Sequence, residues 1–209
     1  KRHSRYTIVD VGTGSGALAV TLAVHLPRAH LIAVDHSSTA LAVARRNAVR
    51  HGVADRVSFV VADLVQPFGV VADVIVANLP YLRCDEMPGD GAGWKGEAGP
   101  DASRARIRHP LAWEPYAALD GGPDGLQWIR RLLWLAGGRL RRGGMLVAEM
   151  GAGQGATLLS LARQLFPEAE VTVQRDYAGL DRVLVVSEPA HALDALADPC
   201  GAGLHQGVA

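Results

Sequence analysis

The sequence predicts an α/β fold in which a mostly parallel sheet is covered by helices on both faces. Short apolar runs alternate with segments of helical periodicity along most of the 209 residues, as in chains built from strand–helix–strand units. The first apolar run leads into a glycine-rich turn, a feature of the ligand-binding edge of such sheets. The last two apolar runs have no helix between them, so we expect one of those two strands to be antiparallel.

Four strands are predicted in the first half of the chain. They are the apolar runs at 6–12, 30–35, 56–63 and 72–78. The first two are joined by a predicted helix at 17–26, which ends at Pro27 and is apolar on nearly every side, as expected for a helix packed between layers. A second helix begins at Ser37 or Ser38, whose hydroxyl can cap it, and stops at Gly52.

The second half of the chain continues the alternation. Residues 125–136 carry an apolar stripe of helical period, and 156–166 form another predicted helix that is stopped by Pro167. The remaining strands are predicted at 143–150, 170–176 and 181–187. Together these elements predict one domain over residues 1–188.

Two segments do not follow the alternation. Residues 88–100 contain seven Gly or Pro in thirteen positions, which predicts a flexible loop. Residues 189–209 are rich in Ala, Gly and Pro and are predicted to be a disordered tail. The chain opens at Lys1 almost directly on a strand, which is consistent with a piece of a longer protein.

The composition excludes several classes of function. The 21 basic and 21 acidic residues balance, so no strong attraction to bare nucleic acid or to an anionic membrane is expected. The two cysteines, Cys84 and Cys200, have no metal-binding spacing and do not form a disulfide framework. No stretch approaches the ~20 apolar residues of a membrane helix. We therefore expect a cytoplasmic protein with free thiols and no metal.

The glycine turn is the first candidate binding site. It has the sequence DVGTGSGA, which lets the backbone turn sharply and lets a ligand approach without a Cβ in the way. The spacing G-x-G-x-G suits an adenosyl cofactor, whereas G-x-G-x-x-A, using Ala17, also fits a loose dinucleotide fingerprint. The candidate cofactor-binding residues of the turn are Gly12, Thr13, Gly14, Ser15 and Gly16.

Acidic residues end three of the predicted strands. Asp35 closes the second strand, where a carboxylate can accept hydrogen bonds from both hydroxyls of a ribose, which suits NAD and S-adenosylmethionine equally. Asp63 closes the third strand, where an adenine amino group could lie near it and Leu64. Asp10 is expected to stabilise the glycine turn, and Glu149 to be structural.

Several blocks of the sequence resemble one known family. The blocks DVGTGSGALAV, AVDHSSTALAVARRNA, NLPY, ALDGGPDGL, GGMLVAEMGAGQ and DYAGLDRVLVV occur in the order found in the HemK/PrmC family, and the resemblance covers residues 5–187. Members are class I S-adenosylmethionine-dependent methyltransferases that act on the glutamine of the Gly-Gly-Gln motif in peptide chain release factors. The ALDGGPDGL block and the closing D-x-x-G-x-D-R block make the resemblance specific.

The resemblance implies a fold, a cofactor and a set of site residues. It implies a Rossmann-like, seven-stranded, mostly parallel sheet with an antiparallel last strand, and S-adenosylmethionine as the cofactor. It implies that residues 12–16 line the methionine end of the cofactor, that Asp35 holds the ribose and that Leu64 lies by the adenine. The family's N-P-P-Y motif falls on Asn78, Leu79, Pro80 and Tyr81, with Asn78 also bordering the cofactor.

The chain departs from the family pattern in two ways. Leu79 replaces the first proline of the motif, and NLPY as such also resembles the motif of ribosomal RNA adenine dimethylases. The helical N-terminal domain with which family members grip the release factor is missing from this sequence. Substrate recognition is therefore less firmly predicted than methyl transfer.

The chemistry of amide methylation explains why an Asn–x–Pro–Tyr segment would be used. The lone pair of an amide nitrogen is delocalised, so the protein mainly has to orient that nitrogen towards the sulfonium methyl. The side-chain oxygen of Asn78 and the backbone carbonyl of Leu79 can accept from the two N–H groups. Pro80 keeps residue 79 extended, and Tyr81 offers a flat face to the planar amide.

Four functions therefore compete. The first is glutamine N5-methylation of a release factor by a monomeric enzyme without direct contact to nucleic acid. The second is adenine N6-methylation of RNA or DNA, since an adenine amino group fits the same acceptors, although that class needs a basic groove. The third is a nicotinamide oxidoreductase, and the fourth an inactive paralogue that binds S-adenosylmethionine.

Overall fold

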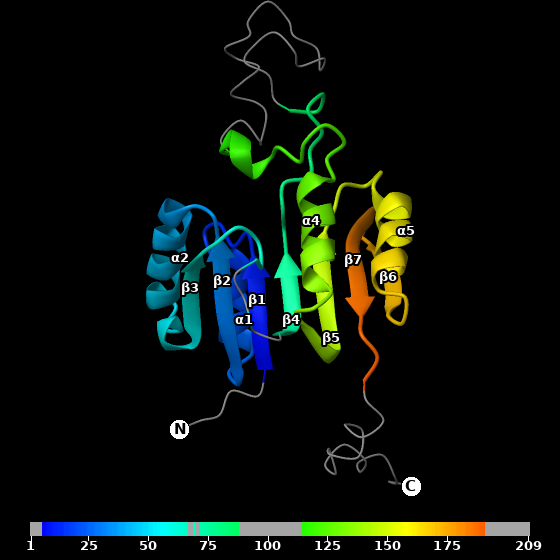
Figure 1. The fold of residues 1–209 in the computed structure, drawn as a ribbon. Helices are drawn as coiled ribbons and strands as arrows, with labels where there is room; N and C mark the ends of the chain where they lie inside the picture. The colour runs from blue at the N-terminus through cyan, green and yellow to red at the C-terminus, as the bar shows by residue number, and fades with distance from the viewer. Residues whose placement is uncertain (1–5, 67–68, 70–71, 88–113, 191–209) are drawn as a thin grey trace, which may run out of the picture.

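The computed structural model describes residues 6–66, 69, 72–87 and 114–190. In these ranges the chain forms one seven-stranded sheet with the strand order β3-β2-β1-β4-β5-β7-β6 (Figure 1). The predicted loop at 88–100 and almost all of the predicted tail at 189–209 lie outside the described residues. None of the helices in the described ranges is long and apolar enough to span a membrane.

The elements follow the predicted order with small shifts at their ends. The strands are β1 (Tyr6–Val11), β2 (Ala29–Asp35), β3 (Val57–Val61), β4 (Ala72–Ala77), β5 (Leu140–Glu149), β6 (Glu170–Arg175) and β7 (Asp181–Ser187). The helices are α1 (Ala17–His25), α2 (Ser38–Arg50), α4 (Gln127–Ala136) and α5 (Gly155–Leu165), with the 3₁₀ turns η1 (Ala54–Arg56) and η3 (Tyr116–Ala118).

The direction of the strands confirms the predicted sheet. Strands β1 to β5 pair in parallel, whereas β7 lies between β5 and β6 and is antiparallel to both. The last strand is antiparallel because a short turn, not a helix, joins β6 to β7. The parallel strands therefore end at one common edge of the sheet, which is where ligands bind in open α/β proteins.

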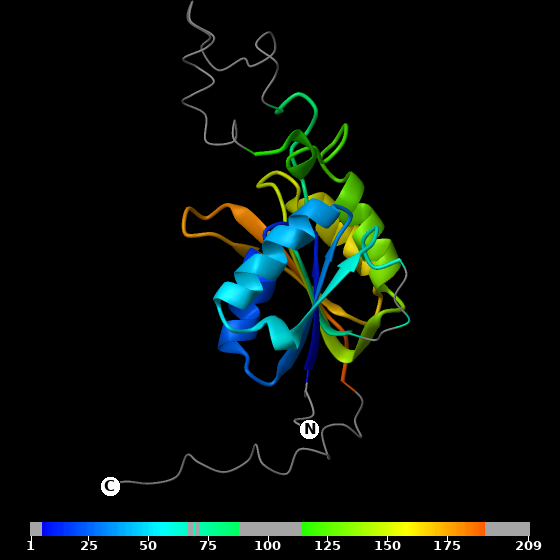
Figure 2. The ribbon, with the colours of Figure 1, turned by 90° about the vertical axis from the view of Figure 1, so that its left-hand side faces the viewer.

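Side chains alternate between two hydrophobic clusters, one on each face of the sheet. In β1, Ile8 belongs to one cluster, and Val9 and Val11 belong to the other. Helices α1 and α2 cover the first face, while α4 and α5 cover the second, as the edge-on view shows (Figure 2). This alternation is the period-2 pattern of a strand buried on both faces.

One prediction about helix α1 is wrong. A helix apolar on nearly every side was expected to lie between layers, but only Ala19, Val20 and Ala23 are buried. Leu18 and Val24 are 40% and 45% exposed. The small buried residues let the helix pack closely on the sheet, and within the described part of the chain no further layer covers its outer side.

Helix α2 begins and ends where the sequence predicts. The Ser37 side chain accepts a hydrogen bond from the Ala40 N–H at 3.2 Å, which makes Ser37 the N-cap. Gly52 follows the helix with a φ of 68°, a conformation that suits glycine. This helix carries the chain away from Asp35 and so keeps the end of β2 open for other contacts.

Candidate active site

Candidate functional residues from four adjacent strands meet at one edge of the sheet. The order β2-β1-β4-β5 places Asp35, Gly12, Asn78 and Glu149 side by side, because each lies at or directly after the C-terminal end of its strand. These residues are far apart in the sequence. The fold therefore gathers the glycine turn, an acid and the Asn–Leu–Pro–Tyr segment into one site.

The glycine turn is tight on two sides and open on the third. A Cβ at Gly12 would lie 2.8 Å from Leu79 Cδ2, and one at Gly16 would lie 2.9 Å from Ala44 Cβ. A Cβ at Gly14 would have nothing within 4 Å among the described residues. Gly12 and Gly16 are thus required by packing, whereas the space over Gly14 is free to receive a ligand.

Asp10 holds the turn from within, as predicted. Its Oδ2 accepts hydrogen bonds from Thr13 Oγ1 at 2.6 Å and from the Ala19 N–H at 2.9 Å. The residue is 1% exposed, and this burial raises its pKa despite the two hydrogen bonds. Thr13 is therefore engaged with the protein. The Ser15 carbonyl is also engaged, since it accepts from Asn47 Nδ2 at 2.8 Å.

Asp35 is buried and oriented by backbone donors. Its Oδ2 accepts from the Gly14 N–H at 2.9 Å, and its Oδ1 accepts from the Ser37 N–H at 2.8 Å. A carboxylate has about four acceptor sites, so each oxygen can accept another hydrogen bond. The geometry fits a diol such as a ribose, held beside the open glycine turn.

Asp63 and Leu64 follow β3 at the neighbouring position. Asp63 is half-exposed and forms an ion pair with Arg131 of α4, with Oδ2 and Nη2 2.6 Å apart. Leu64 is buried and has a φ of 53°. It is the only non-glycine residue with a positive φ in the described part of the chain. Such a conformation costs roughly 1–2 kcal/mol, so the buried leucine side chain must hold it in place. Contact of either residue with an adenine remains a prediction.

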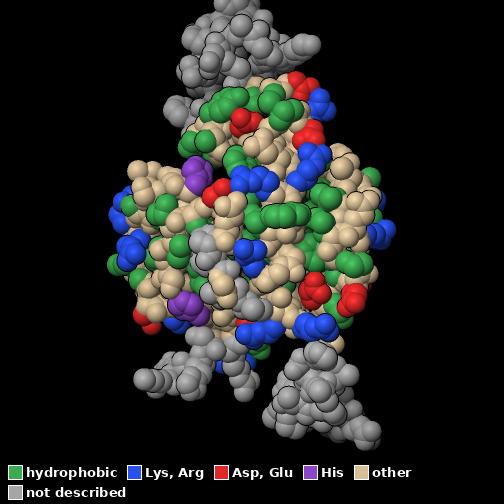
Figure 3. All heavy atoms as spheres, viewed as in Figure 1, with side chains coloured by type: hydrophobic (Ala, Val, Ile, Leu, Met, Phe, Trp, Pro, Cys, Tyr) green, Lys and Arg blue, Asp and Glu red, His purple; other side chains and the backbone are tan. Residues whose placement is uncertain are grey.

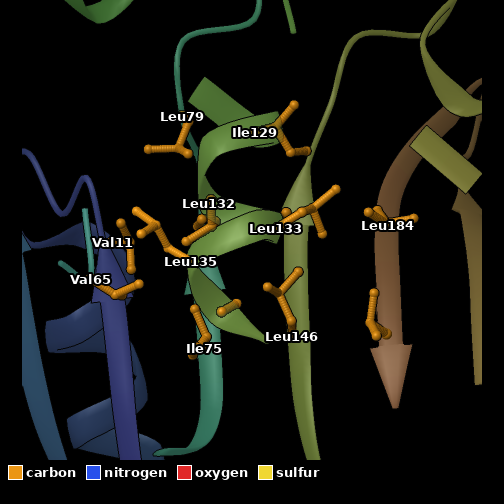
Figure 4. Close-up of a cluster of buried hydrophobic side chains, with 14 of the residues drawn as sticks. Val11, Val65, Ile75, Leu79, Ile129, Leu132, Leu133, Leu135, Leu146 and Leu184 are labelled. Atoms are coloured by element: carbon orange, nitrogen blue, oxygen red, sulfur yellow. The ribbon is translucent and has the colours of Figure 1, made fainter. Parts of the chain in front are cut away.

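The Asn–Leu–Pro–Tyr segment leaves the end of β4 with alternating exposure. The Asn78 side chain is exposed, and within the described ranges it has no hydrogen-bond partner. Leu79 is buried at 7% exposure and belongs to the core cluster on the α4 side of the sheet, with its side chain extending towards β1 (Figure 4). The side chain at this position therefore serves packing, which leaves an acceptor role to its backbone carbonyl.

Tyr81 is held at its hydroxyl by Glu149. The phenol donates a hydrogen bond to Glu149 Oε1 at 3.3 Å. Burial, and then the negative charge of Glu149, raise the pKa of Tyr81. Glu149 was expected to be structural only, and the structure shows that its structural contact is with a predicted site residue.

The ALDGGPDGL and GAGQ blocks, which the sequence analysis used only to support the family resemblance, form hydrogen bonds to the segment that contains Tyr81. The Leu82 N–H donates to the Leu119 carbonyl at 3.0 Å, and the Gly121 N–H donates to the Leu82 carbonyl at 2.8 Å. Gln154 of the GAGQ block donates to the Tyr81 carbonyl at 3.0 Å. The residues that make these contacts lie in the ALDGGPDGL and GAGQ blocks, but no local sequence pattern predicted which residues the two blocks would contact.

A cavity of about 550 Å³ lies beside Tyr81. Its lining includes Tyr81, Glu86, Asp124, Gln154 and Arg182. This volume lies within the roughly 300–1,000 Å³ typical of ligand pockets. Of the predicted site residues, Tyr81 therefore borders a space in which a side chain of a second molecule can fit.

Arg182 shows why the closing D-x-x-G-x-D-R block belongs to the site. Its guanidinium donates to Asp176 at 3.3 Å and to the Met150 carbonyl at 3.3 Å. Asp176 in turn accepts from the backbone N–H groups of Ala178 and Leu180. The β6–β7 hairpin is thereby tied to the end of β5, next to Glu149.

Comparisons with known proteins agree with the predicted family resemblance. Residues 1–87 match the family model of the Methyltransferase small domain. The release factor glutamine methyltransferase of Moorella thermoacetica is 43% identical over 178 residues, which is 85% of this chain and 57% of that protein. The protein of the same name from Cereibacter sphaeroides is 38% identical over 184 residues, or 88% of this chain and 60% of its own length. The chain thus spans less than two thirds of these relatives.

Solved structures share the fold at low sequence identity. A methyltransferase from Pyrococcus furiosus superposes with a TM-score of 0.61 at 15% identity, covering 90% of this chain and 78% of that one. The ribosomal protein L11 methylase of Lactobacillus delbrueckii subsp. bulgaricus gives 0.58 at 17% identity, with coverage of 88% and 70%. These matches show that the chain has the fold of these methyltransferases.

The predicted resemblance is confirmed by relatives that match along most of the chain, and the site carries the motifs on which it was based. Over most of its length the chain is similar to the release factor glutamine methyltransferases, and its fold is that of the class I S-adenosylmethionine-dependent methyltransferases.

Proposed function

We propose that the protein transfers a methyl group from S-adenosylmethionine to the side-chain amide nitrogen of the glutamine in the Gly-Gly-Gln motif of a peptide chain release factor. The observation that carries the proposal is the end of β4. There the backbone of the exposed Asn78 lies beside the glycine turn, with its carbonyl oxygen 4.0 Å from the position of a Cβ on Gly12, while the Leu79 side chain is buried in the core. Similarity to release factor glutamine methyltransferases supports the same assignment.

The first task of the site is to hold the cofactor, whose sulfonium supplies an activated methyl group when it is bound. The open space over Gly14 admits the cofactor to the turn at residues 12–16. Asp35 has acceptor capacity left for the two ribose hydroxyls after it binds two backbone N–H groups. We assign the adenine to the side of Asp63 and Leu64, beyond the end of β3.

The second task is to orient the nitrogen of the substrate. An amide nitrogen is a weak nucleophile, and correct positioning can lower a barrier by roughly 7–11 kcal/mol. The Asn78 side-chain oxygen and the Leu79 carbonyl would accept the two N–H groups, and Tyr81 would pack against the amide plane. Oxygen acceptors also stabilise the positive charge that develops on the nitrogen, and the spare proton can leave to water.

Adenine N6-methylation is the alternative with a structural argument, because an adenine amino group offers the same two N–H donors. The surface gives it little support. Figure 3 shows basic and acidic side chains interspersed on the face that carries α4. Two of the arginines there, Arg130 and Arg131, form ion pairs with Asp124 and Asp63. A nucleic-acid groove needs unpaired positive charge.

A protein substrate from the translation machinery also suggests where and how the enzyme works. We propose a cytoplasmic enzyme that acts as a monomer, with the release factor as its macromolecular partner and without direct contact to nucleic acid or to a membrane. Because the chain spans 57% of the length of the relative from Moorella thermoacetica, a short Gly-Gly-Gln peptide is a useful substrate beside the whole release factor.

The proposal is tested by incubating the protein with S-adenosylmethionine labelled on its methyl group. A release factor, a Gly-Gly-Gln peptide and an RNA are offered in parallel, and the label is located by mass spectrometry. We expect label on the glutamine nitrogen of the protein or peptide. Label on RNA alone would establish the adenine alternative, and label on no substrate despite cofactor binding would indicate an inactive paralogue.

The role of Asn78 is tested in the same assay. Asn78→Ala should leave cofactor affinity nearly unchanged and lower methyl transfer by about 10²–10³-fold, the usual cost of removing one oriented polar group that stabilises a transition state. Gln164→Ala is the control, because Gln164 is an exposed amide on α5. Equal turnover in Asn78→Ala and Gln164→Ala would contradict the amide-holding role.

A further inference from the structure

The carboxamide of Gln154 connects three segments around the site. Its Nε2 donates to the Tyr81 carbonyl at 3.0 Å and to the Gly125 carbonyl at 3.1 Å. Its Oε1 accepts from the Gly151 N–H at 2.8 Å. Both amide hydrogens and the oxygen are thus used, and each bond reaches a different segment: the end of β4, the 119–126 loop and the β5–α5 turn.

The carboxamide is closely packed on the sides of Gly125 and Gly151. A Cβ at Gly125 would overlap both the Tyr81 carbonyl oxygen and Gln154 Nε2, and one at Gly151 would lie 3.2 Å from Gln154 Cδ. Gly125 also has a φ of 71°, which disfavours other residues. The backbone carbonyls that Gln154 binds are therefore held at close contact with it.

Gln154 and Glu149 hold Tyr81 from opposite ends. The hydroxyl of the tyrosine is bound by Glu149 and its backbone carbonyl by Gln154. Tyr81 follows Asn78 and Leu79 by two or three residues, with Pro80 limiting the flexibility between them. A shift at the Tyr81 carbonyl is thus passed to the two acceptors proposed for the substrate amide.

We propose that Gln154 is a positioning residue for methyl transfer, which fixes the backbone of Tyr81 and through it the orientation of the Asn78 side chain and the Leu79 carbonyl. The proposal rests on the function proposed above. Only a side chain with two donors and one acceptor can make all three bonds, so neither Glu nor Ala replaces it. A carboxylate would face two carbonyl oxygens, and a methyl group would make none of the bonds.

The test compares Gln154→Ala and Gln154→Glu with Gln164→Ala, a substitution on α5, the helix that follows Gln154. Because a displacement of about 1 Å can cost 10²-fold in rate, we expect kcat for the Gly-Gly-Gln substrate to fall roughly 10–100-fold in both Gln154 variants. The dissociation constant of the cofactor should stay within about twofold of the parent value, since the hydrogen bonds of Gln154 go to Tyr81, Gly125 and Gly151 and not to the glycine turn. Gln164→Ala should match the parent protein in both measurements.

The pH profile of Gln154→Glu separates positioning from a general loss of structure. A protonated Glu can donate one hydrogen bond to a carbonyl, whereas the ionised form repels both carbonyls. The activity of this variant relative to the parent protein should therefore rise as the pH falls from 8 to about 6, with no such rise for Gln154→Ala. A flat ratio in Gln154→Glu would overturn the proposed donor role.

Hydrogen exchange tests the hydrogen bond between Gln154 and the Tyr81 carbonyl without requiring methyl transfer. The amides of Leu82 and Gly121 are bonded across the segments that Gln154 joins, so both should exchange faster in Gln154→Ala. Unchanged exchange together with a parent-like kcat would overturn the inference, as would a loss of activity matched by an equal loss of cofactor binding. If the parent protein labels no substrate, the proposed function fails, and the exchange rates still decide whether Gln154 holds this backbone.

Discussion

Truncation of Leu79 tests how this chain uses the one motif position where it departs from the family that it resembles. The side chain is 7% exposed, belongs to the core cluster under α4 and touches the glycine turn, since a Cβ on Gly12 would lie 2.8 Å from its Cδ2 (Figure 4). Leu→Ala at a buried site costs about 2–5 kcal/mol, including the cavity that is left. At about 2–4 °C per kcal/mol for a domain of this size, a loss of 3 kcal/mol lowers Tm by about 6–12 °C.

The catalytic effect of Leu79→Ala should be much smaller than its effect on stability. The proposed acceptor is the backbone carbonyl, which the substitution retains, and Pro80 still keeps residue 79 extended. Assayed well below its Tm, Leu79→Ala should therefore lose far less kcat than Asn78→Ala. Thermal unfolding by circular dichroism and the methyl-transfer assay give the two numbers.

Leu79→Met provides the matched control, because it conserves volume and should cost less than about 1.5 kcal/mol. An unchanged Tm in Leu79→Ala would refute the packing argument. A folded Leu79→Met protein without methyl transfer would show that the side chain, and not the carbonyl, contacts the substrate.

Three further predictions follow from single residues of the site. Asp35→Ala should weaken cofactor binding at least about tenfold, because a hydrogen bond to a charged group contributes roughly 1.5–3 kcal/mol; calorimetry that gives an unchanged Kd would contradict the ribose assignment. Gly125→Ala should lower both Tm and kcat, because its Cβ would overlap the Tyr81 carbonyl, whereas Gly138→Ala, with nothing within 4 Å among the described residues, should change stability by less than about 1 kcal/mol. Burial raises the pKa of Asp10 above its ordinary 3.8, so the folded state favours the protonated acid, and the parent protein should lose stability relative to Asp10→Asn as the pH rises above about 4. Parallel unfolding curves for these two proteins from pH 4 to 7 would contradict that sign.

Local sequence patterns were sufficient for the elements and for the polar residues at their ends. Apolar runs of strand length end at Asp35 and Asn78, and glycines at fixed spacing follow the first run, because strand period, capping and turn chemistry act between residues close in the chain. Ser37 is the helix cap that its position predicts. The parallel sheet and its antiparallel last strand also follow, since they depend on whether a helix separates two strands.

The contacts among these residues depend on the fold, because they join segments up to about seventy positions apart. Glu149 and Gln154 meet Tyr81 across 68 and 73 residues, and no local period reports such a pairing. Helix α1 also shows that local patterns cannot predict tertiary contacts. Its apolar composition predicts burial on every side, but it packs against the sheet on one side only, so the other side is exposed. The sequence by itself determined which groups stand at the strand ends, and tertiary packing alone decided which of them hold one another in place, because hydrogen bonds and close contacts form between neighbours in space.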